Sequence, residues 1–109
     1  MRDKDLQIIE KIIKRVCTTL RYCEDETQDS FHGNTMLQEA CVFNLLQIGE
    51  LANHLSSEFT AANASIPWHQ MVGLRNRLVH DYDGIRLTIV WETITNDFPK
   101  LRPQLEKLL

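Results

Sequence analysis

The chain has 109 residues, of which 43% are hydrophobic, so it can bury one core and we expect a single domain over residues 1–109. Its apolar runs are short and its first residues are charged, so we expect no signal peptide, no membrane span and a cytoplasmic location. A net charge of −3 argues against a general nucleic-acid binder, because counterion release needs lysine and arginine clustered opposite phosphates.

The first half of the chain predicts two long helices separated by a loop. Apolar residues recur at three- and four-residue steps from Asp5 to about Tyr22, which is the period of a helix that buries one face. The acidic and polar stretch 24–34 is predicted to be a loop. Thr35 followed by Gln38 resembles a capping box, which indicates that the second helix begins there.

The second helix has apolar residues on two faces. The main stripe is Leu37, Cys41, Leu45, Ile48, Ala52 and Leu55, and a second, shorter stripe is Val42, Leu46 and Gly49. A glycine inside a helix costs about 1 kcal/mol relative to alanine, so Gly49 predicts that another helix approaches closely at this point. The two faces favour a packed bundle and allow a contact between subunits.

The second half of the chain predicts two more long helices and a short terminal one. Pro67 fits the first turn of a third helix, which should run to about His80. Residues 83–84 are Asp-Gly and mark a turn, after which a fourth helix is predicted to end at Pro99, followed by a short helix over residues 101–108. Because period-two alternation is sustained nowhere, we predict an all-α fold, an up-and-down bundle of four longer helices plus a short C-terminal helix.

The cysteines and one acid–histidine pair favour structural roles. Cys17, Cys23 and Cys41 are odd in number and match no metal-ligand spacing, so we expect reduced, mostly packed thiols and neither a metal site nor a disulfide framework. Glu50 and His54 are four residues apart on the polar side of the second helix, which favours a salt bridge over a catalytic pair.

The distribution of charge tells more than the total. Between Glu58 and Asp81 the chain has no acidic residue, and the basic or titratable residues His69, Arg75, Arg77 and His80 fall inside this window. A neutral-to-basic patch on an acidic protein indicates a localised anion site. The sequence therefore predicts an anion site near the end of the third predicted helix.

Three residues of that helix form a fan that suits RNA cleavage without a metal. Asn76 and His80 are four residues apart and share a face, while Arg75 is displaced from Asn76 by about 100°. In such cleavage the 2′-hydroxyl attacks the adjacent phosphorus and the bond to the 5′-oxygen breaks. His80 would act as general base or acid, Arg75 would bind the non-bridging oxygens, and Asn76 would orient the imidazole or donate to the phosphate. We expect Arg77 to support phosphate binding.

One segment of this kind is an incomplete site. A single histidine cannot be base and acid at once, and Arg75 and His80 lie about 140° apart on an ideal helix. We therefore expect a homodimer in which two such segments face a shared cleft. Spacing alone leaves a structural interpretation open, because Arg77 and Asp81 are an i, i+4 pair and His80 could simply cap a helix end.

Residues 75–82 have the pattern R-x-x-x-x-H-x-Y, which resembles the HepT-like branch of the HEPN superfamily. Segments 44–52, 66–68 and 90–91 look similar too, so the resemblance covers essentially the whole chain. It implies a dimeric HEPN-like helical bundle that acts as a metal-independent endoribonuclease toxin on cellular RNA. It also implies that Arg75 and His80 are the catalytic pair, with Asn76 as the polar residue that often follows the arginine, and that no cofactor is needed.

The resemblance further implies a partner. In the family, the toxin is paired with a minimal nucleotidyltransferase antitoxin that can transfer AMP from ATP to the motif tyrosine, here Tyr82. The structural alternative is that the Tyr82 ring packs at the helix end and its hydroxyl caps a neighbour. Two other functions stay open: a non-catalytic nucleotide- or substrate-binding partner subunit of a nucleotidyltransferase, and a purely structural dimer, which leaves the motif unexplained.

Overall fold

A computed structural model describes residues 2–80 and 87–109, with side chains from residue 4 onward and without that of His80. The elements in chain order are α1 (Arg2–Cys23), α2 (Gln28–His32), α3 (Thr35–Asn53), α4 (Ser57–Ala62), α5 (Trp68–His80), α6 (Leu87–Glu92), the π-helical turn η2 (Thr93–Asp97) and α7 (Phe98–Glu106). These ranges contain no strand. The predicted all-α fold is confirmed.

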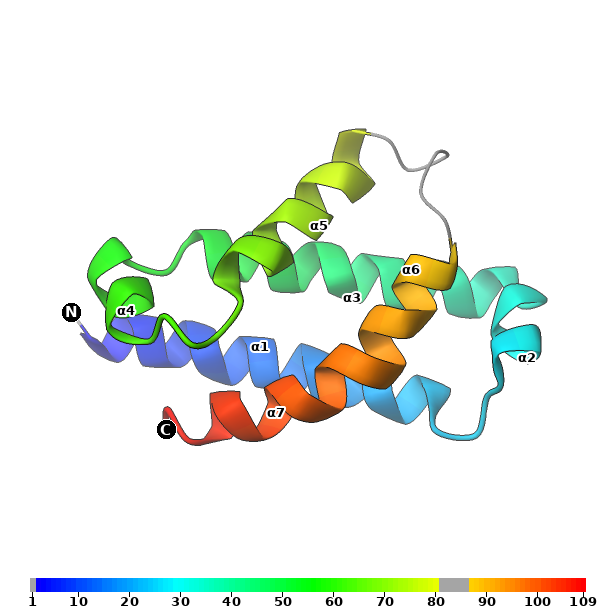
Figure 1. Cartoon of the computed structure of the whole chain (residues 1–109), viewed down its shortest axis with the longest axis horizontal. Coiled ribbons are helices and arrows are strands. Elements are labelled where there is room, and N and C mark those ends of the chain that lie inside the picture. The colour runs from blue at the N-terminus through cyan, green and yellow to red at the C-terminus, as the bar shows by residue number, and fades with distance from the viewer. Residues whose placement is uncertain (1, 81–86) are drawn as a thin grey trace.

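The long helices run up and down the molecule. Figure 1 shows α1 and α3 side by side along the long axis, with α5 on one side of α3 and the run α6–η2–α7 crossing α1 on the other. Since α6, η2 and α7 follow one another without a break, they form the fourth long rod of the bundle. The predicted HEPN-like bundle of four longer helices is therefore confirmed.

The core lies where the apolar stripes of these rods meet. The main stripe predicted for α3 is buried at Cys41, Leu45, Ile48 and Ala52. The largest fully buried apolar side chains come from α1, α2 and the run α6–η2–α7: Ile9, Ile12, Val16, Phe31, Val90, Ile94 and Leu105. Each fully buried side chain of this size contributes roughly 1.5–3 kcal/mol relative to an exposed one.

The predicted loop 24–34 contains a short helix, α2. Thr27 and Ser30 form a reciprocal capping box, in which each side chain accepts a hydrogen bond from the other residue's backbone N–H. Phe31 is fully buried, and its ring centroid lies 5.1 Å from that of Trp91. A helix this short needs tertiary contacts, and the packing of Phe31 on α6 is one that the polar composition of the segment conceals.

The start of α3 differs from the prediction by one residue. Asn34, not Thr35, is the cap, because its Oδ1 accepts a hydrogen bond of 3.0 Å from the backbone nitrogen of Leu37. The Gln38 side chain does not close a capping box. It donates instead to the backbone oxygens of Phe31 and His32, each at 2.9 Å, and so joins α3 to α2.

The prediction that Pro99 ends the fourth helix is wrong. The helical run continues to Glu106, and Pro99 lies in the first turn of α7, where the missing N–H is tolerated. The turn before it is π-helical, and the Phe98 N–H bonds to the oxygen of Thr93, five residues back. The change of hydrogen-bond register accommodates the proline without ending the helix.

Candidate active site at the crossing of α3 and α5

Helices α3 and α5 approach closely at Gly49. A Cβ atom at this position would overlap with Cβ of Arg75, and it would lie 2.8 Å from the backbone oxygen of Met71. Any other residue would force the helices apart. The predicted close approach at Gly49 is confirmed, and the helix that approaches is the one that carries Arg75.

The guanidinium of Arg75 is held from both helices. Its Nη2 lies 2.7 Å from Oε1 of Glu50 on α3, and its Nη1 donates a 2.8 Å hydrogen bond to Oδ1 of Asn76 on α5. The Arg75 side chain is 29% exposed, so the group is fixed but still open to a ligand. A guanidinium held in this way can present its other N–H donors to a phosphate without first becoming ordered.

Glu50 also contacts a second side chain, that of His54. Its Oε2 lies 3.0 Å from Nε2 of His54, one turn farther along α3. The predicted pairing of Glu50 with His54 is confirmed. Sequence reasoning missed the stronger partner, Arg75, and the only local indication was the position of Glu50 directly after Gly49, where α5 comes close.

Of the three residues in the predicted fan, the structure describes the side chains of Arg75 and Asn76. Arg75 and Asn76 are in contact, as expected, and Asn76 is exposed. His80 is the last residue of α5, four residues after Asn76, but its side chain lies outside the described residues. Tyr82 and Asp81 also lie outside them, so the proposed acceptor and the Arg77–Asp81 pair are not described.

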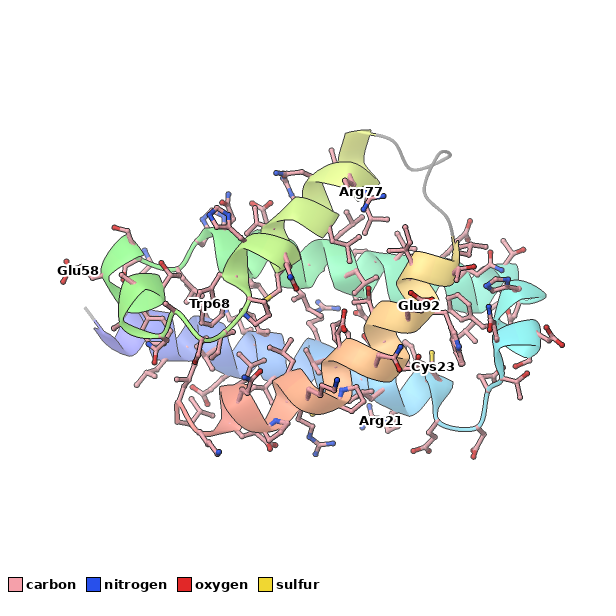
Figure 2. The ribbon with its side chains drawn as sticks, in the orientation of Figure 1. Arg21, Cys23, Glu58, Trp68, Arg77 and Glu92 are labelled. Carbon is pink, nitrogen blue, oxygen red and sulfur yellow. The ribbon has the colours of Figure 1, made fainter. Side chains whose placement is uncertain are left out.

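Arg77 belongs to a different surface. It is two residues from Arg75, which places it about 200° away around the helix. Figure 2 shows Arg77 projecting from α5 on the side where α6 lies. There it lines an apolar groove of about 590 Å³ together with Leu74 of α5 and Lys100 of α7. In the described part of the chain, Arg77 therefore does not contact the group formed by Arg75, Glu50 and Asn76.

Two of the three cysteines have the packing role that was expected for most of them, whereas Cys17 is only partly buried. Cys23 and Cys41 are buried free thiols, and their sulfur atoms lie 3.6 Å apart in a hydrogen bond that raises the pKa of Cys41 and lowers that of Cys23. Within residues 2–80 and 87–109, no three histidine, cysteine, aspartate or glutamate side chains form a group that could hold a metal ion. None of the described helices is both long and apolar enough to cross a membrane.

Comparison with known proteins finds a matching family and several similar proteins. The family model "Ribonuclease HepT-like" matches residues 5–108. Two proteins that carry the name "Putative RNase" are similar to the chain: one from Methanocaldococcus jannaschii is 30% identical over 87% of the chain and 87% of its own length, and one from Caldanaerobacter subterraneus is 35% identical over 74% and 72%. A "Probable ribonuclease HepT" from Thermococcus cleftensis is 28% identical over 94% and 84%. No solved structure matches the chain significantly.

Proposed function

Because the chain belongs to the HepT-like ribonuclease family, we propose that it is the toxin of a toxin–antitoxin pair and cleaves cellular RNA without a metal ion. The observation that carries this proposal is the fixed guanidinium of Arg75, held by Glu50 and Asn76 at the crossing of α3 and α5. Negative charge grows on the non-bridging phosphate oxygens during the reaction. A cation already in place stabilises that charge without reorganising.

The proposed reaction uses no group beyond those of the motif. His80 takes the proton of the 2′-hydroxyl, the 2′-oxygen bonds to the adjacent phosphorus, and the bond from phosphorus to the 5′-oxygen breaks. The products are a 2′,3′-cyclic phosphate and a 5′-hydroxyl. The leaving oxygen takes its proton from a second histidine in the shared cleft of a homodimer, since one imidazole cannot fill both roles.

The cleavage proposal is tested with purified protein and labelled single-stranded RNA or transfer RNA in EDTA. We expect Arg75→Ala and His80→Ala each to lower the cleavage rate by at least 10²-fold. His69→Ala is the matched control, because His69 is an exposed histidine on the same helix, and it should cleave like the wild type. Equal cleavage by the motif variants and the wild type contradicts the proposal, as does the absence of cleavage in every protein. Cleavage that EDTA abolishes contradicts metal independence.

Control of the toxin is proposed to act through Tyr82. A minimal nucleotidyltransferase antitoxin would transfer AMP from ATP to the tyrosine hydroxyl, which adds a bulky anion two residues from His80. Support comes from the R-x-x-x-x-H-x-Y pattern of residues 75–82 and from family membership. Co-expression with such an enzyme should add AMP-sized mass increments to the wild type and none to Tyr82→Phe. Increments on Tyr82→Phe show that the acceptor is another residue.

A further inference from the structure

One face of α1 carries four cations in the first two thirds of the helix. At helical spacing it carries the exposed or half-buried residues Lys4, Lys11, Lys14, Arg15, Thr18 and Tyr22. From Lys11 to the end of the helix at Cys23 there is no acidic residue. Lys4 and Arg15 are eleven residues apart, so the cations extend over about 16 Å. This face is a local exception to the net negative charge of the chain.

Part of this face is hollowed into a groove against α3. Lys11, Lys14, Arg15 and Thr18 of α1 and Gln47 and Leu51 of α3 line a groove of about 530 Å³, which we call the α1–α3 groove. Among the residues that the structure describes, no acidic one lines it. Three cations on one side and an amide on the other form a surface that attracts an extended polyanion.

Arg15 is fixed in this groove by a buried partner. Its Nη1 donates a 3.0 Å hydrogen bond to Oδ1 of Asn44, a side chain only 3% exposed. The Arg15 guanidinium also lies 5.3 Å from the centroid of the Phe43 ring, and Phe43 is 51% exposed. A large apolar ring left open to solvent beside an anchored guanidinium is the combination on which a nucleobase stacks.

The groove lies beside the candidate active site. Gln47 and Leu51 line the groove, and Glu50, which holds Arg75, lies between them on the same turn of α3. The acidic residues Glu50 and Glu10 lie near the groove without lining it. Glu50 is paired with Arg75 and His54, and Glu10 precedes Lys11 on α1 but does not line the groove.

We propose that the α1–α3 groove binds the phosphodiester backbone of single-stranded RNA and leads it to Arg75. Lys11, Lys14 and Arg15 contact successive phosphates, and a base stacks on Phe43. An unpaired strand fits better than a duplex, because bases within a duplex do not expose their faces to an aromatic side chain. This inference rests on the proposed ribonuclease function, since it assigns the substrate-binding surface for that reaction.

The test is direct binding of a fluorescent single-stranded oligonucleotide with 2′-O-methyl groups, which cannot be cleaved through its 2′-oxygen. We expect Lys11→Glu/Lys14→Glu to weaken binding at least tenfold at low salt. The slope of log K against log salt should fall by about 1.4, because each phosphate contact on a single strand contributes about 0.7. Phe43→Ala should weaken binding about tenfold with the slope unchanged.

The control is the charge-matched variant Lys100→Glu/Lys107→Glu, whose lysines are exposed on and just after α7. It should bind like the wild type apart from a small general effect of charge. Arg15→Lys, which keeps the charge but loses the guanidinium fork, should bind several-fold more weakly. Circular-dichroism melting checks that each variant is folded, and the substituted lysines are exposed, so we expect folded proteins.

The outcomes separate this inference from the proposed function. Groove variants that bind and cleave RNA like the wild type, while Arg75→Ala does not cleave, overturn the groove and leave the ribonuclease intact. Wild-type protein that binds the oligonucleotide through the groove but cleaves no RNA supports the groove and contradicts the ribonuclease. Loss of binding to a purified nucleotidyltransferase partner in Lys11→Glu/Lys14→Glu, with RNA binding unchanged, also overturns the inference, since the groove would then serve an acidic protein.

Discussion

At the scale of single residues, Glu50 decides how Arg75 is presented. Its Oε1 lies 2.7 Å from Nη2 of Arg75, and its Oε2 lies 3.0 Å from Nε2 of His54. Both side chains are partly exposed, so the pair contributes little to stability, and its main effect is on orientation. Glu50 therefore acts on the proposed reaction through Arg75 and not by touching RNA.

We expect Glu50→Gln to lower kcat of RNA cleavage about tenfold with little change in stability, because a neutral amide holds the guanidinium less firmly. The measurement is steady-state cleavage together with a thermal melt. Glu39→Gln is the matched control, since Glu39 is also an exposed acid on α3. An unchanged kcat in Glu50→Gln would show that Arg75 needs no such partner.

Asp5 is the residue at which stability should depend on pH. Its Oδ1 accepts a 2.9 Å hydrogen bond from the backbone nitrogen of Ser56 and its Oδ2 a 2.8 Å bond from the hydroxyl, which tie α1 to the start of α4. These bonds hold the pKa of Asp5 below its usual value, the Ser56 backbone bond most strongly. A lowered folded-state pKa adds stability above the unfolded value near 3.8, which is lost as the pH falls through the folded pKa.

We expect Asp5→Asn to be less stable than the wild type at pH 7 and the difference to shrink as the pH falls below about 4, where the wild-type carboxylate also becomes neutral. Urea unfolding at a series of pH values measures this. Asp97→Asn provides the comparison, since Asp97 is exposed at the end of η2. A stability difference that stays constant from pH 7 to pH 3 would show that the charge of Asp5 is not what matters.

At the scale of elements, the crossing of α3 and α5 depends on the missing side chain of Gly49. We expect Gly49→Ala to destabilise the protein by about 1–2 kcal/mol, because overpacking against Met71 and Arg75 outweighs the better helix propensity of alanine. Cleavage should fall as well, since Arg75 must shift. Chemical denaturation and the cleavage assay measure the two effects.

Gly73 provides an internal control for that substitution. It lies in α5, and apart from the backbone of its own helix and its chain neighbours, no atom of the described residues lies within 4 Å of the place where its Cβ would be. Gly73→Ala should therefore stabilise the protein by up to about 1 kcal/mol through helix propensity alone. If both variants gained stability, the close approach at Gly49 would not be limiting.

At the scale of the whole molecule, the proposed homodimer would bury the end of α5. Val79 is 50% exposed and lies one turn after Arg75, on a helix that diverges from the rest of the bundle (Figure 1). A large apolar side chain open to solvent beside the candidate site suits a contact with a second copy. Two α5 segments meeting there would bring two motifs into one cleft.

We expect Val79→Asp to be monomeric in size-exclusion chromatography with light scattering and to lose most RNA cleavage, because a carboxylate cannot be buried unpaired in the contact. Met36→Asp, at an 82% exposed position in the first turn of α3, should remain dimeric. A wild type that is monomeric, or a Val79→Asp variant that stays dimeric, contradicts this arrangement.

The sequence by itself determined the long helices and the segment that holds the candidate site. Amphipathic spacing is local, so the period of apolar residues in α1 and α3 predicts both the helix and the face it buries. Gly49 likewise indicated a close approach, because its cost in a helix needs a reason. The charge window around Arg75 and the fan with Asn76 followed from residue spacing alone.

Only the tertiary structure decided which residues meet. Phe31 anchors α2 by packing on Trp91, Pro99 is accommodated by the π-helical turn before it, and Glu50 pairs with Arg75 from another helix. The physical reason is common to all three. A spacing pattern specifies which face of a helix is buried, whereas the partner on that face depends on how distant helices cross, and at Gly49 that crossing brings Glu50 to Arg75.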